Sequence, residues 1–364
     1  MTAVLRWRSG TVTRVVRQWP GACEVDVAVE AREASDPPSV RALAYPRMVG
    51  RPEVGDRVLL NCNALSRGLG TGGYAFVVAI PDRLPDDAGD AGHAVKARYT
   101  PQQAMGRAVD EVGSAHRAAM VATRDLGGMP VVVADLHSAL PAILAGIHER
   151  PEARRVAYVM LDGGALPAWF SRSLAGVSGL LAGTVTTGQS FGGDLEATNV
   201  HTGLIAARAV LGADIAVVTQ GPGNLGNATA WGFSGTACGE VVNATAALGG
   251  RAIGALRISR SDPRRRHRGV SHHSLTAYGR VALATADLPV PDGIDADLAE
   301  RVAEQLRPLR ARHRLVGVKV DGLEEALRDL PVRLSTMGRG LDDDPAYFLG
   351  CAVAGRHAAD LLRR

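Results

Sequence analysis

The hydrophobic and polar positions along the chain follow two different periods. From Val4 to about Ile80 the segments alternate or run apolar in the period of β-strands, and PG, DPP and VGD turn signals separate them. These segments read TVTRVV, CEVDVAVEA, RALAY, DRVLLNC and YAFVVAIP. Short strands in such close succession predict a small closed barrel of the SH3-like or OB-like kind. We therefore expect a β-barrel domain at residues 1–80 and a linker rich in Pro, Asp and Gly at 81–95.

The remainder of the chain, 96–364, alternates apolar strands with helix-length amphipathic segments. The predicted strands read PVVVADL, RVAYVML, LAGTVTT, DIAVVTQ, AIGALRI, VALATA, LVGVKV and VRLST. This alternation predicts an α/β domain of parallel strands joined by right-handed crossovers, with helices on both faces of the sheet. Because the segment lengths are irregular, an open doubly wound sheet is favoured, and a (β/α)8 barrel is the alternative.

Composition limits the class of protein without naming a function. Aromatic residues make up 4% of the 364 residues, so we expect a core of small aliphatic side chains. The cysteines have no C-x-x-C spacing, which favours buried thiols in a reducing compartment over a zinc ribbon or a redox pair; they are Cys23, Cys62, Cys238 and Cys351. The chain shows neither a signal peptide nor an apolar run long enough to cross a membrane. We therefore expect a cytoplasmic protein.

Polar clusters follow almost every predicted strand of the second domain. They read LHS at 136–138, DGG at 162–164, TTGQSFGGD at 186–194, QGPGNLGN at 220–227, SRSDPRRRHRGVSHHS at 259–274 and STMGRG at 335–340. Because the carboxyl ends of parallel strands lie along one edge of a sheet, we expect these loops to line one crevice. Strand ends need glycine and polar turn residues in any fold, which explains the glycines but not the aspartates and histidines.

The stretch 259–274 has the highest density of chemically active side chains. Asp262-Pro263 predicts a turn, and Ser271 is a candidate N-cap for a helix that carries HHSLTAYG. Histidine titrates near neutral pH and arginine pairs with carboxylates or phosphates, which suits acid-base chemistry on an anion. A solvated loop and a nucleic-acid patch are the alternatives. Since adjacent side chains of a helix diverge, we expect only one of His272 and His273 to act, with His267 reaching across the turn.

These positions give one set of candidate site residues. The candidates for moving protons or orienting an imidazole are His267, His272, Asp262, Asp162 and His137. The candidates for binding a small anionic molecule are Arg264, Arg266, Gly221, Gly223, Asn224, Gln189 and Asp194, the last of which also suits the N-cap of the helix that follows it. A divalent metal stays open, because the residue types fit but their spacing is not diagnostic. A dinucleotide is disfavoured, because no helix directly follows GPGNLG and no acidic residue stands where a ribose needs one.

Seven segments carry a resemblance to a known family. They are GDRVLLNCNALSRGLGTGGYAFVVA, VKARYTPQQ, MPVVVADLHSALPAI, SFGGDLEATNVHTGL, TQGPGNLGNATAWGFSG, SDPRRRHRGVSHHSLTA and STMGRGLDDDPAYF. Together they resemble a bacterial domain-of-unknown-function family, DUF3866, which implies no established activity. From Thr184 to Leu256 the order GQSFGGD, QGPGNLG and ACGEVVNA is similar to part of the glycine and betaine reductase selenoprotein family. That similarity implies an open α/β fold with an anion-binding loop after the fourth strand, while the redox-active cysteine or selenocysteine motif is missing.

Two functional hypotheses follow from these observations. In the first, the protein is a hydrolase-like or lyase-like enzyme, rather than an oxidoreductase, that acts on a small carboxylate or phosphate and forms a homodimer. In the second, it is a nucleic-acid-binding or assembly protein. It would use the Arg-rich loop at 259–274 and the N-terminal barrel, which contains Arg6, Arg8, Arg14 and Arg17.

Overall fold

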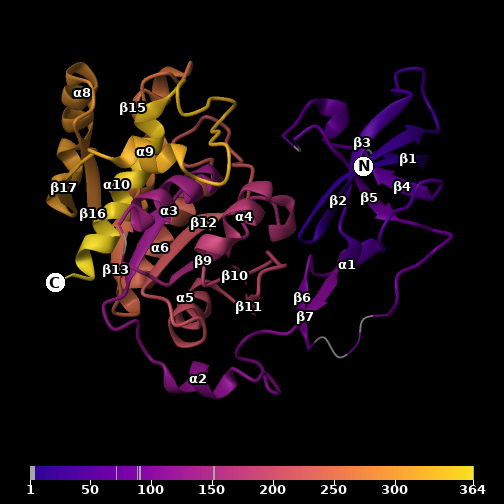
Figure 1. The fold of residues 1–364 in the computed structure, drawn as a ribbon, viewed down its shortest axis with the longest axis horizontal. Coiled ribbons are helices and arrows are strands. Elements are labelled where there is room, and N and C mark those ends of the chain that lie inside the picture. The colour runs from indigo at the N-terminus through magenta and orange to yellow at the C-terminus, as the bar shows by residue number, and fades with distance from the viewer. Residues whose placement is uncertain (1–4, 71, 88, 90–91, 151, 364) are drawn as a thin grey trace. The chain divides into compact units, whose positions relative to one another are not determined.

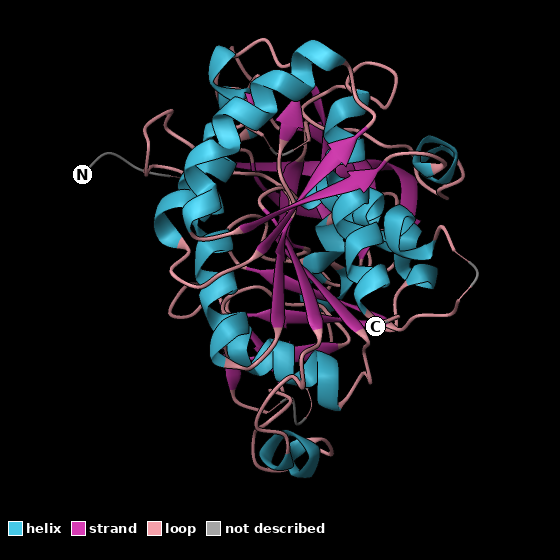
Figure 2. Ribbon diagram, turned by 90° about the vertical axis from the view of Figure 1, so that its left-hand side faces the viewer, coloured by secondary structure: helices cyan, strands magenta, loops and turns pink. Residues whose placement is uncertain are grey.

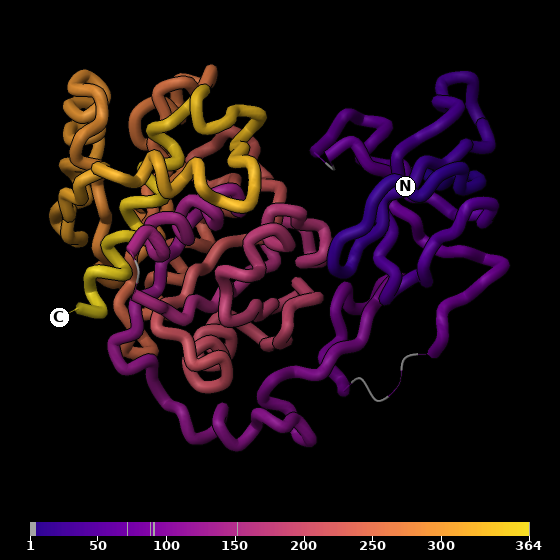
Figure 3. The backbone as a smooth tube through the Cα atoms, viewed as in Figure 1, coloured from indigo at the N-terminus to yellow at the C-terminus, as the bar shows by residue number. Residues whose placement is uncertain are grey.

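The computed structural model describes residues 5–70, 72–87, 89, 92–150 and 152–363. The chain divides into two compact units, Met1–Ala91 with Ala97–Met105, and Gly92–Lys96 with Gly106–Arg364. The path of the chain through each unit can be followed in Figure 1 and Figure 3. The short strands β6 (Ala94–Lys96) and β7 (Ala104–Gly106) lie where the chain passes between the units, so β6 begins within the segment predicted as a linker.

The first unit contains a closed barrel of five strands. They are β1 (Trp7–Trp19), β2 (Ala22–Val29), β3 (Ser39–Ala44), β4 (Arg57–Asn61) and β5 (Ala75–Ala79), with the short helix α1 (Pro46–Val49) after β3. The strand order is β1-β2-β3-β5-β4, and β4 pairs with β1 to close the barrel. Alternation along the strands places side chains such as Val12, Val25 and Leu60 inside. The predicted small barrel is confirmed.

The second unit is built on an open parallel sheet of eight strands. They are β8 (Pro130–Ala134), β9 (Val156–Leu161), β10 (Gly183–Thr187), β11 (Leu195–Ala197), β12 (Ile215–Gln220), β13 (Arg251–Gly254), β16 (Asp287–Asp292) and β17 (Arg314–Lys319). Their order is β11-β10-β9-β12-β8-β13-β16-β17, and every neighbouring pair is parallel. The predicted doubly wound sheet is therefore confirmed, and the alternative of a closed (β/α)8 barrel is not what the described residues form.

Helices cover both faces of this sheet (Figure 2). One face packs against α3 (Leu140–His148), α4 (Arg172–Val177), α9 (Leu323–Arg328) and α10 (Pro345–Leu361). The other packs against α5 (Val200–Ala209), α6 (Ala237–Ala247) and α8 (Ala296–Leu306), and α2 (Arg117–Ala122) precedes β8. Because successive strand residues point to opposite faces, Val131 and Val133 belong to one core and Val132 to the other.

Some predicted strands are wrong. VALATA at 281–286 is not a strand: its first residue ends the π-helical turn η7 (Ala277–Val281), the others form irregular chain, and β16 begins only at Asp287. VRLST at 332–336 forms no strand, and only an isolated bridge joins Thr336 to Arg339. AIGALRI is divided between β13 and the short β14 (Ile258–Ser259), which pairs with β15 (Gly269–Val270). Short apolar runs do not distinguish a strand from buried irregular chain.

The strand order creates a topological switch point in the middle of the sheet. After β8 the chain builds β9, β10 and β11 on one side, returns to place β12 beside β8, and then crosses to β13 on the other side of β8. The loops that follow β12, β8 and β13 therefore leave the carboxyl edge from three adjacent strands. In open α/β sheets this is the place where ligands bind.

Candidate functional site

Loops from the three central strands meet at the carboxyl edge. Asp135 directly follows β8, Gln220 ends β12, and Arg257 lies three residues after β13. The Gln220 side-chain amide donates to the Asp135 carbonyl at 2.8 Å, and Arg257 Nη1 lies 3.8 Å from Asp135 Oδ2. These contacts bring together segments that are far apart in the sequence, as the parallel topology requires.

Three imidazoles form a cluster at this edge, which we call the histidine cluster: His267, His272 and His273. His267 ends the short 3-10 helix η6 (Arg265–His267), whereas His272 and His273 begin α7 (His272–Thr276). Ser271 is the N-cap of α7, as predicted, and its hydroxyl accepts the His273 backbone N–H. The ring centroids lie 4.5 to 5.0 Å apart. One ring nitrogen from each histidine lies within 4.8 Å of those of the other two.

The expectation that only one of His272 and His273 acts stays a prediction, but both rings belong to the histidine cluster. The two rings do diverge, with an angle of 64° between their planes. His267 lies against both, however, with its ring centroid 5.0 Å from each, and so joins them into one cluster. Phe233 adds a second contact to both rings, stacked on His273 at 3.9 Å and edge-on to His272 at 5.9 Å.

Hydrogen bonds orient two of the three rings. His267 Nδ1 lies 2.7 Å from the Ser271 hydroxyl, and His273 Nδ1 lies 3.3 Å from Asp135 Oδ2. His272 Nε2, in contrast, is buried and has no hydrogen-bond partner among the described residues. The carboxylate that orients an imidazole is thus Asp135, where the sequence predicted Asp262 or Asp162. Asp135 lies directly after the first strand of the parallel sheet, and this position was the signal available in the sequence.

Burial and nearby arginines keep two imidazoles of the histidine cluster uncharged at neutral pH. Desolvation, followed by the charges of Arg257 and Arg264, lowers the pKa of His267 to about 3. Desolvation, followed by the charge of His273, lowers the pKa of His272 to about 4, and Arg266 contributes to this shift. Burial opposes ionisation of Asp135, but the His273 hydrogen bond and the Arg257 charge together hold the pKa of Asp135 below its usual value.

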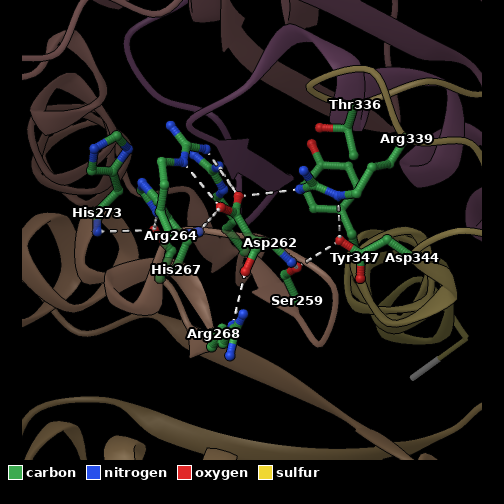
Figure 4. A network of polar contacts seen from close by, with 12 residues as sticks. Ser259, Asp262, Arg264, His267, Arg268, His273, Thr336, Arg339, Asp344 and Tyr347 are labelled. Carbon is green, nitrogen blue, oxygen red and sulfur yellow. Dashed lines mark hydrogen bonds and ion pairs between the residues drawn. The ribbon is translucent and has the colours of Figure 1, made fainter.

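A network of ion pairs surrounds Asp262 beside the histidine cluster (Figure 4). The Asp262 side chain is fully buried, and Arg264 binds it with two hydrogen bonds of 2.9 Å. Arg339 Nη2 and Arg257 Nη2 lie 3.1 and 3.4 Å from Asp262 Oδ2. Burial opposes ionisation of Asp262, but the hydrogen bonds and charge of Arg264, together with His267, hold the pKa of Asp262 far below its usual range. Arg264, predicted to bind a substrate anion, is therefore already paired with the carboxylate of Asp262.

The same network fixes the Arg-rich loop to the segment that precedes α10. The Ser259 hydroxyl donates to Asp344 Oδ2 at 2.6 Å and accepts the Asp262 backbone N–H at 2.9 Å. Arg339 Nε donates to Asp344 Oδ2 at 3.1 Å. Arg266 takes no part: its side chain is exposed, and no hydrogen bond or ion pair engages it in the described part of the chain.

His137 belongs to a separate cluster of buried hydroxyl groups. Its Nδ1 lies 3.0 Å from the Tyr158 hydroxyl and its Nε2 lies 2.6 Å from the Ser171 hydroxyl. Tyr158 in turn lies 2.8 Å from Thr219 Oγ1. His137 thus follows the first strand as predicted, but its ring nitrogens contact hydroxyl groups, and neither hydroxyl belongs to the histidine cluster. Burial lowers the pKa of His137 to about 4.

The buried His137 predicts a pH-dependent stability. Its pKa is about 4 in the folded chain against an ordinary value of 6.5, so the unfolded chain binds more protons between these values. The free energy of unfolding should be highest above about pH 6.5 and fall as the pH drops towards 4. Urea titrations across this range should show a shallower fall for His137→Asn than for the wild type. The exposed His201 supplies the control His201→Asn, and equal slopes for all three proteins would contradict the prediction.

The loops after β9, β10 and β12 also lie in contact. Asp162 Oδ2 accepts the Gln189 backbone N–H at 2.8 Å. A side chain on Gly164 would collide with the Gly221 carbonyl, so glycine is required for the two loops to approach this closely. The Gly221 N–H, predicted to bind an anion, instead donates to the Leu161 carbonyl at 3.2 Å.

Two buried amide groups, one at the end of β12 and one in the loop after it, retain unused hydrogen-bonding atoms. Gln220 Oε1 and Asn224 Nδ2 are buried and have no partner among the described residues. Asn224 is fixed through its Oδ1, which accepts from the Ser234 hydroxyl at 2.9 Å. Gly223, the glycine next to Asn224, has a φ of 89°, a left-handed conformation that favours glycine.

Asp194 lies at the opposite edge of the sheet from its predicted position. It immediately precedes β11, and its Oδ2 accepts the N–H of Thr184, near the start of β10, at 2.8 Å. The chain turns back after β10 to begin the parallel strand β11, which is too short to give a periodic signal in the sequence. Asp194 does not cap a helix either, because Asn199 is the N-cap of α5.

Comparison with protein families identifies the group to which this chain belongs. A family model described as "Protein of unknown function (DUF3866)" matches residues 41–355. The chain belongs to the DUF3866 family. The match begins within the barrel and includes Asp135, the histidine cluster and Asp344. No curated protein and no solved structure matches the chain, and the similarity to the glycine and betaine reductase selenoproteins has no support.

Two further features bear on the class of this DUF3866-family protein. All four cysteines are free and buried, as predicted. Among the described residues, no helix is long and apolar enough to cross a membrane.

The barrel arginines that suggested nucleic-acid binding are engaged in ion pairs. The pairs are Arg6 with Asp36, Arg8 with Asp36, Arg14 with Asp26 and Arg17 with Glu24, at 2.6 to 3.0 Å. Phosphate binding depends on cations that neutralise the backbone charge. These guanidinium groups already face carboxylates, and the nucleic-acid hypothesis stays a prediction.

Proposed function

We propose that this DUF3866-family protein is an enzyme that hydrolyses a small anionic substrate at the carboxyl edge of its parallel sheet. The observation that supports this function is the histidine cluster, which lies beside the loops of the topological switch point. Hydrolysis needs a group that either accepts a proton from the attacking water or lowers the pKa of that water. An imidazole nitrogen can accept that proton, and closely spaced imidazoles can instead hold a cation that lowers the pKa of the water.

The anionic character of the substrate is inferred from Arg266. Its guanidinium is exposed, it has no partner among the described residues, and its charge contributes to the low pKa of His272. Arginine binds carboxylate and phosphate groups with two parallel hydrogen bonds. Arg264, the other predicted anchor, is held by Asp262 and would have to break two hydrogen bonds to bind an anion. Substrate recognition is therefore assigned to Arg266.

The buried amide atoms of Gln220 and Asn224 supply a second element of recognition. Buried polar atoms in folded proteins are nearly always hydrogen-bonded, so two unpaired amides near the same edge suggest that a substrate provides the missing partners. Asn224 Nδ2 is a donor and suits an anionic oxygen, whereas Gln220 Oε1 is an acceptor and suits a hydroxyl or amine. The substrate class is thus an anion that also carries a hydrogen-bond donor.

The test is a hydrolysis screen of the purified full-length protein on matched p-nitrophenyl esters. The anionic members are the phosphate and the hemisuccinate, and the neutral member is the acetate. We expect kcat/KM for an anionic ester to exceed that for the acetate at least about 10-fold, and Arg266→Ala to remove this preference because a lost charge-assisted pair costs about 10-fold or more. The neighbouring Arg265, also exposed, gives the control Arg265→Ala, which should keep it. Absence of hydrolysis, or equal effects of the two variants, would count against the proposal.

A further inference from the structure

We propose that His267, His272 and His273 bind one divalent cation of the zinc class, with Asp135 as the outer carboxylate that orients His273. This inference rests on the proposed hydrolytic function and assigns the means by which that function activates water. It makes the histidine cluster a metal centre with three protein ligands, and it does not need the imidazoles to exchange protons with substrate.

The spacing of the ring nitrogens fits such a centre. In a tetrahedral site with Zn–N bonds of about 2.0 Å, the ligand nitrogens lie about 3.3 Å apart. One nitrogen from each histidine already lies within 4.8 Å of the other two. Each pair therefore has to close by no more than about 1.5 Å, which rotation of the side chains can supply.

The hydrogen bonds of the cluster leave the required lone pairs available. In the tautomer in which Nδ1 of His267 and of His273 donates, to Ser271 and Asp135 respectively, Nε2 of each ring keeps a lone pair that can bind a cation. A metal-binding histidine commonly donates its other ring N–H to a carboxylate, and the His273–Asp135 pair has this arrangement. His272 Nε2 is buried without a partner, which is unfavourable in a metal-free protein and would be satisfied by a cation.

The ligand set also indicates the kind of cation and its use. Three imidazoles suit zinc, cobalt, nickel or copper rather than calcium or magnesium, which prefer oxygen ligands. Three protein ligands leave a fourth position for water, as in catalytic rather than structural zinc sites. The nearby Arg257 does not oppose the cation with a free charge, because Asp135 and Asp262 lie 3.8 and 3.4 Å from its guanidinium.

The experiment is a metal titration of the tag-free, full-length protein after treatment with a chelator. Zn²⁺ is titrated by calorimetry, Co²⁺ by its visible absorption, and bound metal is counted by mass spectrometry after desalting. We expect one equivalent per chain and the intense visible bands of four-coordinate Co²⁺. His272→Ala and the larger polar variant His272→Gln should weaken binding at least about 100-fold, and Asp135→Asn about 10- to 100-fold. The control His201→Ala, at an exposed histidine of α5, should bind as the wild type does.

The outcomes separate this inference from the proposed function. If the folded wild type retains no cation, or if His272→Ala and His272→Gln bind like the wild type, the metal centre is wrong. Hydrolysis by the metal-free protein at the rate of the reconstituted protein would also overturn the metal centre while supporting the proposed function. Stoichiometric binding that depends on His272, without hydrolysis of any ester, would support the metal centre and overturn the proposed function.

Discussion

Replacing Asp262 by alanine is expected to lower the free energy of unfolding by about 3 to 5 kcal/mol. The Asp262 carboxylate is fully buried, and it pairs with Arg264, Arg339 and Arg257 at 2.9 to 3.4 Å. Removing it leaves guanidinium groups close together without their shared counter-charge, in surroundings where water compensates poorly. The loss should be visible as a lower midpoint in urea titrations at neutral pH.

A surface aspartate in the same unit supplies the matched control. Asp342 pairs with Arg328 at 2.7 Å, but both side chains are at least half exposed. Exposed ion pairs contribute about 0 to 1 kcal/mol, so Asp342→Ala should change the free energy of unfolding by no more than that. Similar losses for Asp262→Ala and Asp342→Ala would show that burial of the Asp262 network has no energetic consequence.

Replacing His272 by alanine is expected to reduce kcat/KM for the preferred anionic ester at least about 100-fold. In the proposed function this imidazole is one of three that hold the attacking water, either directly or through a cation, so the other two cannot replace it. The same change removes a buried nitrogen that has no partner, and it should therefore leave the free energy of unfolding within about 1 kcal/mol of the wild type.

The control for His272→Ala is His201→Ala, which removes an exposed imidazole from α5. Its kcat/KM should equal that of the wild type. If His272→Ala retains wild-type kcat/KM, the histidine cluster does not take part in hydrolysis. Circular dichroism follows the folded structure of both variants. If His272→Ala and His201→Ala lose activity together with folded structure, His272→Gln becomes the deciding variant in place of His272→Ala.

The parts of the fold that the sequence predicted are those with regular local signals. The barrel strands alternate in a period of two, and the strands of the central sheet are apolar runs bounded by turn residues. The meeting of the segments that follow β8, β12 and β13 was predicted from topology, since parallel strands present their following loops at one edge. The capping of α7 by Ser271 is equally local and was also predicted.

The parts that the sequence did not predict depend on contacts between distant residues. Asp135 and His273 are 138 positions apart, and Arg339 lies 77 positions after Asp262, so neither pairing leaves a local signal. Asp194 was misplaced because the strand it precedes has three residues and no period. The clustering of His272 and His273 with His267 was missed because helix geometry alone omits His267, whose ring centroid lies 5.0 Å from each of the other two.

The central claim is that the histidine cluster activates water to hydrolyse an anionic substrate. Its most direct measurement is a single-turnover reaction in heavy-oxygen water, with mass spectrometry of the acid released from the preferred ester. We expect the wild-type protein to place one heavy oxygen in each product molecule and His272→Ala to yield no labelled product above the uncatalysed background. Product without the label from the wild type, or equal labelled product from both proteins, would contradict it.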